Sequence, residues 1–262
     1  MVSGPIFTAR STGVCRLNWC SMAESQNELP RHIVIVPDGN RRWAKSRGLP
    51  AFIGHERGAA TAEKIFDHAL KLGIQNLTFW GSSYDNVTKR SSEEVEFLFK
   101  LFGSYFAKLL EDKERILEKN HIRVRVLGRW RETFPESVRS VIEDIIRKTG
   151  SYTERNFTLL MAYSGVDEMT AAVAAVADDA RKNGTLMVTP ETVKRALWTR
   201  DLPPVDLVIR TGGEPHWSSG LLMWDVADAE LYFTEMLWPD FSPEEFNKAL
   251  AYYTGRERRR GA

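Results

Sequence analysis

The sequence lacks several features that would assign it to a class of protein at once. Only two cysteines occur, Cys15 and Cys20, in a polar N-terminal segment, so there is neither a disulfide framework nor a zinc-ligand spacing. Lys and Arg total 36 against 35 Asp and Glu, a net charge of +1, which gives no reason to expect a nucleic-acid partner. No apolar run approaches the roughly 20 residues of a membrane span.

The N-terminal region also has no obvious targeting signal. Residues 1–31 lack the apolar core of a signal peptide, and Met22 is an alternative start. We expect residues 1–31 to form a tail that is disordered or partly helical, and residues 32–262 to form one domain. With 43% hydrophobic and 27% charged residues, the composition is that of an ordinary globular protein. A cytoplasmic location is therefore predicted.

Strand and helix patterns alternate along the predicted domain, which favours βαβ units and a mostly parallel sheet of an α/β fold. Six strands are predicted, at 32–37, 76–81, 121–127, 156–162, 205–209 and 230–234. Helices are predicted at 55–72, 92–118, 135–149, 167–182, 190–198 and 243–256.

The helix predicted at 92–118 has an unusually broad apolar surface. Its apolar residues between Val95 and Leu110 cover more than the single stripe expected of a surface helix. Either the helix is buried on most sides, or one of its faces lines an apolar cavity.

Common catalytic motifs are absent as well: there is no GxxxxGKS/T loop, no GxGxxG after the first strand, no GxSxG, no HExxH and no DDxxD. Polar clusters instead follow three predicted strands. They read "PDGNRRW" at 37–43, "GSSYDN" at 81–86 and "IRTGGEPHWSS" at 209–219. Since ligands bind outside the carboxyl ends of parallel strands, we expect these clusters to meet at one site.

The residue types in these clusters suit a diphosphate. Arg41, Arg42 and Arg210 offer planar forks for phosphate oxygens, and the glycines allow backbone N–H groups to approach a phosphate. Asp38 and Glu230 are oxygen ligands of the kind that Mg²⁺ takes together with substrate phosphates. With the broad apolar helix, the pattern predicts a Mg²⁺–diphosphate site for a substrate whose other end is apolar.

The order of these motifs resembles that of the cis-prenyltransferases, the undecaprenyl diphosphate synthase family. The resemblance runs from about His32 to Gly261 and rests on five segments. They are "DGNRRWAKSRG", "GHERGA" at 54–59, "SSYDN" with "EEV" at 93–95, "DLVIRTGGE" at 206–214, and "AELYFTEMLWPDF" at 229–241. It implies an α/β domain with an apolar product tunnel, and a homodimer that joins isopentenyl diphosphate to an allylic prenyl diphosphate with Mg²⁺. The product would be a cis-polyprenyl lipid carrier for cell-wall or glycan synthesis, delivered to a membrane with which the enzyme associates loosely.

The resemblance also assigns roles to residues. Asp38 would bind Mg²⁺ at the allylic diphosphate, and Glu230 would be a second metal ligand reached across the subunit interface. Asp38, His55, Ser83 and Asn86 would be catalytic, with Ser83 and Asn86 handling the departing proton. Substrate binding would fall to Gly39, Asn40, Arg41, Arg42, Trp43, His55, Ser83, Tyr84, Asp85, Lys89, Arg90, Glu94, Arg210, Glu214, His216, Trp217, Ser218, Arg259 and Gly261.

Several positions depart from the family pattern. Arg41 stands where the family usually has Gly, Ala51 replaces a substrate-binding arginine, and His216 replaces another. We therefore expect the isopentenyl diphosphate subsite to be weakened or remodelled, and product length stays open. Two alternatives keep the fold: a short-chain or branching prenyl diphosphate synthase, and a non-catalytic subunit of a prenyltransferase complex. The aspartate at position 38 argues against the second.

Overall fold

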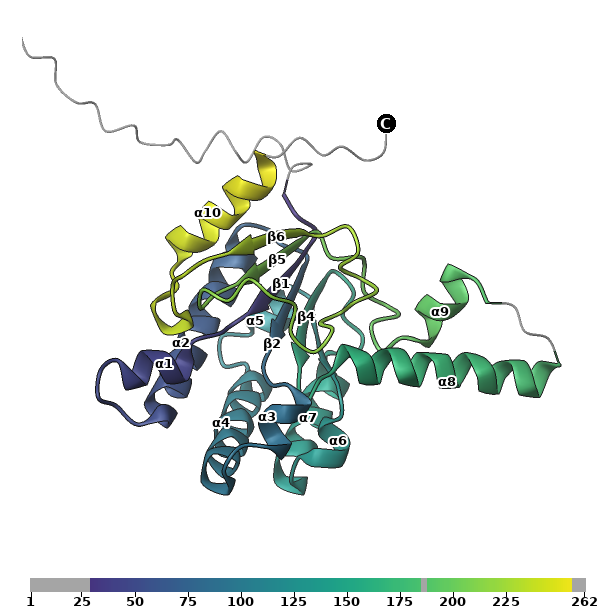
Figure 1. Ribbon diagram of the computed structural model, residues 1–262, viewed down its shortest axis with the longest axis horizontal. Coiled ribbons are helices and arrows are strands. Elements are labelled where there is room, and N and C mark those ends of the chain that lie inside the picture. The colour runs from purple at the N-terminus through teal and green to yellow at the C-terminus, as the bar shows by residue number, and fades with distance from the viewer. Residues whose placement is uncertain (1–28, 185–187, 256–262) are drawn as a thin grey trace, which may run out of the picture.

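A six-stranded sheet forms the centre of the protein (Figure 1). The structure, a computed structural model, describes residues 29–184 and 188–255. The strands are β1 (His32–Val36), β2 (Asn76–Trp80), β3 (Ile122–Leu127), β4 (Arg155–Leu160), β5 (Leu207–Arg210) and β6 (Glu230–Phe233), in the order β3-β4-β2-β1-β5-β6. Each pair of neighbours is parallel. The predicted α/β fold is confirmed, and the sheet is wholly rather than mostly parallel.

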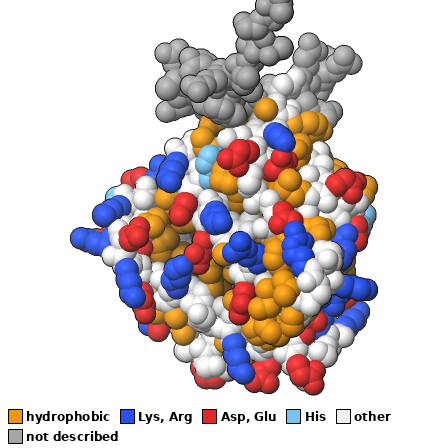
Figure 2. All heavy atoms as spheres, turned by 90° about the vertical axis from the view of Figure 1, so that its left-hand side faces the viewer, with side chains coloured by type: hydrophobic (Ala, Val, Ile, Leu, Met, Phe, Trp, Pro, Cys, Tyr) orange, Lys and Arg blue, Asp and Glu red, His pale blue; other side chains and the backbone are white. Residues whose placement is uncertain are grey.

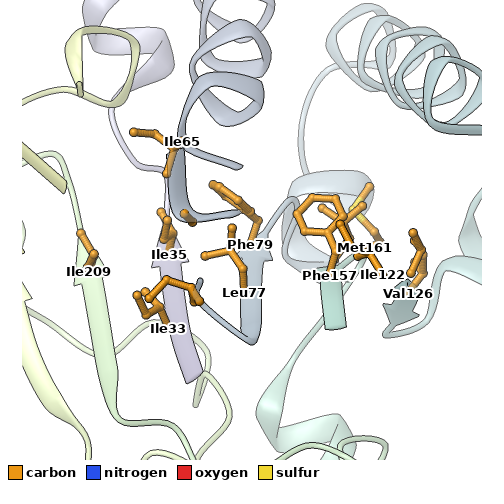
Figure 3. Packing of buried hydrophobic residues seen from close by; sticks show 14 of the residues in the cluster. Ile33, Ile35, Ile65, Leu77, Phe79, Ile122, Val126, Phe157, Met161 and Ile209 are labelled. Carbon is orange, nitrogen blue, oxygen red and sulfur yellow. The ribbon is translucent and has the colours of Figure 1, made fainter. Parts of the chain in front are cut away.

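The sheet is covered on both faces, which is why β1 reads as a continuous β-branched run. Ile33 and Ile35 belong to one core cluster, and Val34 and Val36 to the other, because successive side chains of a strand point to opposite faces. Figure 3 shows the first cluster, in which Ile65 from α2 packs over the strands.

The helices are α1 (Asn40–Lys45), α2 (Ala51–Lys71), α3 (Tyr84–Thr88), α4 (Ser92–Glu111), α5 (Ile116–Lys119), α6 (Trp130–Thr133), α7 (Glu136–Thr149), α8 (Gly165–Asn183), α9 (Pro190–Ala196) and α10 (Pro243–Thr254), with a 3₁₀ helix η2 (Trp238–Asp240). The first core cluster contains buried residues of α2, α4, α7 and α10. Helix α8 extends away from the sheet with α9 beside it (Figure 1).

The single helix predicted at 92–118 is wrong, because the chain turns after Glu111. Asp112 and Arg115 have left-handed backbones, with φ of 43° and 55°, a conformation that ends a helix. The Asp112 carboxylate then accepts the backbone N–H of Leu117 at 3.2 Å, at the start of α5. The broad apolar surface therefore belongs to the 20-residue α4 alone.

Two glycines of α2 let α1 lie unusually close. A Cβ at Gly54 would lie 2.1 Å from the Asn40 carbonyl oxygen, and a Cβ at Gly58 would lie 2.3 Å from Asn40 Oδ1. The first contact, with a backbone atom, excludes a side chain at Gly54, and a side chain at Gly58 would displace the Asn40 side chain. The "GHERG" segment, 54–58, thus fixes the packing of α1 on α2, and α1 follows directly on the "PDG" turn.

Candidate active site

The loops after β1 and β5 hold Asp38 from two directions. Its backbone N–H donates to Thr211 Oγ1 at 2.9 Å, and Thr211 Oγ1 donates in turn to the Asp38 carbonyl oxygen at 2.8 Å. Gly39, with φ of 108°, turns the chain into α1, a backbone that glycine adopts without strain. A Cβ at Gly212 would lie 2.6 Å from the Arg42 guanidinium, so the two loops are in close contact.

Arg210 connects the Asp38 carboxylate to the following loop. Its NH2 lies 3.0 Å from Asp38 Oδ2, while its NH1 donates to Ser218 Oγ at 2.6 Å and to the His216 carbonyl at 2.9 Å. The Arg210 side chain is only 6% exposed, and Arg42 lies 3.3 Å from the other Asp38 oxygen. The site therefore contains a carboxylate between two guanidinium groups.

Glu214 adds a second carboxylate beside this pair. It lies 3.6 Å from the guanidinium groups of Arg42 and Arg210, and 3.6 Å from the imidazole of His216. The His216 Nε2 is also 3.0 Å from Ser218 Oγ. Glu214, His216 and Ser218, three of the residues predicted from the "RTGGEPHWSS" segment, thus lie around Arg210.

A second charged group of residues surrounds Glu94 at the start of α4. Its carboxylate lies 2.7 Å from Arg90, 3.2 Å from His55 Nε2 and 3.6 Å from Arg41. Burial raises the pKa of Glu94, but the nearby Arg90 and the hydrogen bond with His55 bring it below the ordinary value. Burial also lowers the pKa of His55, partly offset by the hydrogen bond to Glu94. One carboxylate thus joins α1, α2 and α4.

Ser83 and Asn86 cap the short helix α3 reciprocally. Ser83 Oγ accepts the Asn86 N–H at 3.1 Å, and Asn86 Oδ1 accepts the Ser83 N–H at 3.2 Å. A bridge between Ser83 and Tyr163 ties this loop to the end of β4. Asp85 and Lys89, further along α3, form an exposed pair at 2.9 Å.

Two adjacent cavities lie at the carboxyl ends of the strands. The first, about 380 Å³, has a polar wall that includes Asp38, Arg90, Arg210, Ser83, Asn86 and Ser218. The second, about 110 Å³, is almost wholly apolar and lies against α4, with Leu101, Phe102, Tyr105, Phe157 and Met161 on its wall. Asn40, His55 and Gly81 line both cavities. A polar compartment therefore borders an apolar one.

Charged side chains of both signs are interspersed over the neighbouring surface. On the face seen in Figure 2, Lys and Arg alternate with Asp and Glu rather than forming a region of one sign. The cations around Asp38 are thus a local feature of the site.

Some predicted residues do not meet at the cavities. Glu230 begins β6 and pairs with Leu207 at the start of β5. Within one chain it therefore lies at the amino ends of the strands, whereas Asp38 lies at their carboxyl ends. Its predicted role, across a subunit interface, stays a prediction. Arg259 and Gly261 lie outside the described residues, as does almost all of the predicted tail, 1–31.

Three predicted aromatic residues contact other parts of the chain instead. They are Trp43, whose indole donates to Asp240 at 2.7 Å, Tyr84, whose ring lies 4.3 Å from the Arg129 guanidinium carbon, and Trp217, whose indole donates to the Leu221 carbonyl at 3.0 Å. Trp43 lines neither cavity. We therefore regard its part in the site as indirect.

The structure adds supporting residues that the sequence reasoning missed. Thr211 positions Asp38, and the buried Tyr163 hydroxyl accepts the N–H of Leu222 at 3.2 Å and donates to the buried Glu168. Thr211 stands inside the "IRTGG" segment and could have been suspected from it. Tyr163 had no comparable signal, because it stands outside the motif segments and its contact with Leu222 joins residues 59 apart in the chain.

The donor set fits a metal ion only if the substrate completes it. Among residues 29–184 and 188–255 there is no group of three or more His, Cys, Asp or Glu that could hold a metal. Mg²⁺ usually takes one or two carboxylates, with waters and substrate phosphates as its other ligands. The Asp38 carboxylate on the wall of the polar cavity suits that arrangement.

Comparisons with known proteins agree with this geometry. The family described as "Putative undecaprenyl diphosphate synthase" matches residues 36–261. The chain belongs to this family. It is 39% identical over 233 residues to the isoprenyl transferase of Thermotoga maritima, covering 89% of this chain and 97% of that one. It is 40% identical over 239 residues to that of Thermus thermophilus, covering 89% of each.

A solved structure shares the fold. Lavandulyl diphosphate synthase from Lavandula x intermedia, in complex with dimethylallyl diphosphate, matches with a TM-score of 0.81 and 30% identity, over 89% of this chain and 98% of that one. The chain is thus an isoprenyl transferase, an enzyme that transfers prenyl groups. No helix among the described residues is long and apolar enough to cross a membrane.

Proposed function

We propose that this prenyltransferase condenses isopentenyl diphosphate with an allylic diphosphate, such as farnesyl diphosphate, to give a cis-polyprenyl diphosphate. The observation that carries the proposal is the pair of adjacent cavities, one polar and one apolar, which share wall residues. A prenyl diphosphate has a charged head and a hydrocarbon tail, which match the polar and the apolar cavity. Its head would lie among Asp38 and the arginines, and its tail below α4.

The two diphosphates would occupy different sides of Asp38. The allylic diphosphate would lie at the start of α1, where Gly39, Asn40, Arg41 and Arg42 follow the aspartate. Asn40 Oδ1 is buried without a hydrogen-bond partner in the described protein, which leaves this end of α1 incompletely satisfied. Such a group is costly unless a ligand or water relieves it.

Isopentenyl diphosphate would lie beside Arg210. The guanidinium already contacts Ser218, and its Nε is buried without a partner in the described residues. His216 lies next to Ser218, and Arg90 lines the same polar cavity. In this arrangement Arg210 is shared between the isopentenyl side and Asp38.

The reaction makes one carbon–carbon bond and releases diphosphate and a proton. The allylic C–O bond breaks with its electron pair going to the diphosphate, the isopentenyl double bond attacks the allylic carbon, and a proton leaves the isopentenyl unit. Arg42 and Arg210 would stabilise the charge that develops on the leaving group. Ser83 and Asn86 on the cavity wall would orient the isopentenyl unit and assist departure of the proton.

Mg²⁺ is the cofactor that this donor set suits best. Asp38 would hold it together with phosphate oxygens, and the Glu230 of a partner subunit is a proposed further ligand. When bound, the ion would neutralise negative charge on the leaving diphosphate. The protein's own contribution is the position of the Asp38 carboxylate, because the Thr211 hydroxyl holds the Asp38 backbone.

A homodimer of the domain 32–262 is part of the proposal. The edge strand β6 carries Tyr232 and Phe233, and the Phe233 side chain is 37% exposed. An uncovered edge strand with exposed apolar side chains is a common site of association. Delivery of the product to a membrane, as a lipid carrier for cell-wall or glycan synthesis, is the role that fits an apolar product.

A short-chain or branching product is the second candidate. Tyr105 stands between the apolar cavity and a third pocket between α2, α4 and α5, so it limits the length available to a hydrocarbon tail. The similar lavandulyl diphosphate synthase was solved with dimethylallyl diphosphate, which favours testing this short allylic substrate. Incubation with isopentenyl diphosphate, Mg²⁺ and either dimethylallyl or farnesyl diphosphate, followed by mass spectrometry, distinguishes the two products.

A further inference from the structure

Trp43, Arg47 and Asp240 form a closed cluster next to the candidate active site. The Trp43 indole N–H donates to Asp240 Oδ1 at 2.7 Å, and Arg47 donates to Asp240 Oδ2 at 3.1 Å. The Arg47 guanidinium also lies over the Trp43 ring, 4.2 Å from its centre. Each of the three residues therefore contacts the other two.

Asp240 belongs to a segment that already supports the site. It ends η2, whose first residue, Trp238, donates its backbone N–H to the Asp38 carbonyl at 3.0 Å and its indole N–H to the Gly58 carbonyl at 2.8 Å. Trp238 is buried, with 1% exposure. The short helix η2 is thus bonded to the Asp38 turn and to α2, and through Asp240 to α1.

Helix α1 depends on such outside contacts for its position. It has six residues and no side-chain cap at its N-terminus, and a helix of that length is not stable alone. Arg41 and Arg42 form ion pairs with Glu94 and Asp38. The backbone of α1 is held by the close approach of α2 at Gly54 and Gly58, and its Trp43 side chain by the bond to Asp240. Asn40, at its start, is on the wall of both cavities, whereas Trp43 and Asp240 line neither.

We propose that Asp240 is a positioning residue for the allylic diphosphate subsite, acting through the Trp43 indole N–H. It fixes the rotation of α1 and hence the places of Asn40 and Arg41. This inference rests on the proposed function, since it names the substrate that α1 receives. The isopentenyl side, built on β5 and the loop after it, is bonded to η2 only indirectly. We therefore expect loss of the Asp240 bond to alter the binding of isopentenyl diphosphate little.

The test compares four single variants and one double variant. Asp240→Ala removes the acceptor and Trp43→Phe removes the donor, whereas Asp240→Asn keeps an acceptor oxygen for the indole. The control is Asp201→Ala, because Asp201 is similarly half-exposed and also pairs with an arginine, Arg125, at 3.1 Å. Circular dichroism and thermal midpoints establish that each variant is folded.

Steady-state kinetics should separate the two substrates. Asp240→Ala and Trp43→Phe should each raise the allylic KM about tenfold, as removal of an outer supporting group commonly does, with the isopentenyl diphosphate KM within about twofold of wild type. Asp240→Asn should recover most of the loss. The double variant Trp43→Phe, Asp240→Ala should be no worse than Asp240→Ala alone, because Asp240→Ala already lacks the bond that Trp43→Phe removes. Equal KM values in Asp240→Ala and Asp201→Ala, or fully additive effects, would overturn the proposal.

A second measurement does not depend on turnover. Hydrogen exchange of the α1 amides, 40–45, should be faster in Asp240→Ala than in wild type and unchanged in Asp201→Ala. If the wild-type protein made no product, the proposed function would fail, but α1 exchange would still report on positioning. Unchanged exchange in Asp240→Ala would overturn the positioning role whatever the activity.

Discussion

Arg210 bridges Asp38 and Ser218: one amino group of its guanidinium lies 3.0 Å from the Asp38 carboxylate and the other 2.6 Å from Ser218 Oγ. These partners come from the turn after β1 and the loop after β5, 172 and 8 residues away in the chain. The parallel pairing of Val36 with Arg210 places them together. The planar guanidinium of Arg210 can bond to Asp38 and Ser218 at once, whereas the single ammonium group of a lysine cannot do so in the same geometry.

Arg210→Lys should therefore impair the enzyme although it keeps the positive charge. We expect kcat/KM for isopentenyl diphosphate to fall by roughly 10²-fold, since one preorganised donor is typically worth that much. Arg125→Lys, on β3, is the matched control and should stay within about twofold. Wild-type kinetics in Arg210→Lys would show that the fork itself is not required.

His216 should contribute to the binding of isopentenyl diphosphate. Its ring lies 3.0 Å from Ser218 Oγ, whereas an arginine at this position would offer a planar fork for phosphate oxygens. His216→Arg should therefore lower the KM for isopentenyl diphosphate and leave the allylic KM unchanged. If His216→Ala keeps the wild-type KM for isopentenyl diphosphate, the residue does not bind substrate.

The sheet and the placement of the clusters were predictable because both follow from local pattern. Continuous β-branched runs such as 33–36 have few uses besides a buried parallel strand, and their carboxyl ends must share an edge. The break at Asp112 was not predictable, since it depends on a left-handed backbone within a sequence of good helix formers. The bond from Trp43 to Asp240 joins residues 197 apart in the chain, and no periodicity encodes such a contact.

His32 should make the stability of the fold depend on pH. It is 1% exposed, with Nδ1 2.9 Å from the Pro203 carbonyl and Nε2 2.8 Å from Thr78 Oγ1. The carbonyl only accepts, so Nδ1 carries the proton of the neutral ring. Burial lowers the pKa of His32 below its ordinary value of about 6.5, partly offset by the bond to Pro203.

The sign of the effect follows from proton uptake. Below about pH 6.5 the unfolded chain binds a proton at this position before the folded chain does, so stability falls on acidification. His32→Gln should cost about 1–3 kcal/mol at pH 7.5 through lost buried hydrogen bonds, but should lose less further stability between pH 7.5 and 5.5. Urea unfolding of both proteins at the two pH values measures this difference. An equal loss in wild type and variant would mean that His32 does not contribute.

Tyr105 should limit the length of the product. It lines both the apolar cavity and the pocket between α2, α4 and α5, so Tyr105→Ala would join the two spaces. We expect the longest product to grow by at least one isoprene unit. Tyr152→Ala, a variant at a tyrosine that stacks on His121, is the control and should leave the product distribution unchanged. An unaltered distribution in Tyr105→Ala would place the end of the tail elsewhere.

The most direct test of the account is product formation by the purified protein and its Asp38→Ala variant. Both are incubated with isopentenyl diphosphate, farnesyl diphosphate and Mg²⁺, and the products are identified by mass spectrometry, with the exposed Asp178→Ala as control. We expect wild type and control to extend the farnesyl chain, and Asp38→Ala to be slower by a factor on the order of 10²–10³ or more while remaining folded. Chain extension by Asp38→Ala at the wild-type rate would contradict the assignment of this site.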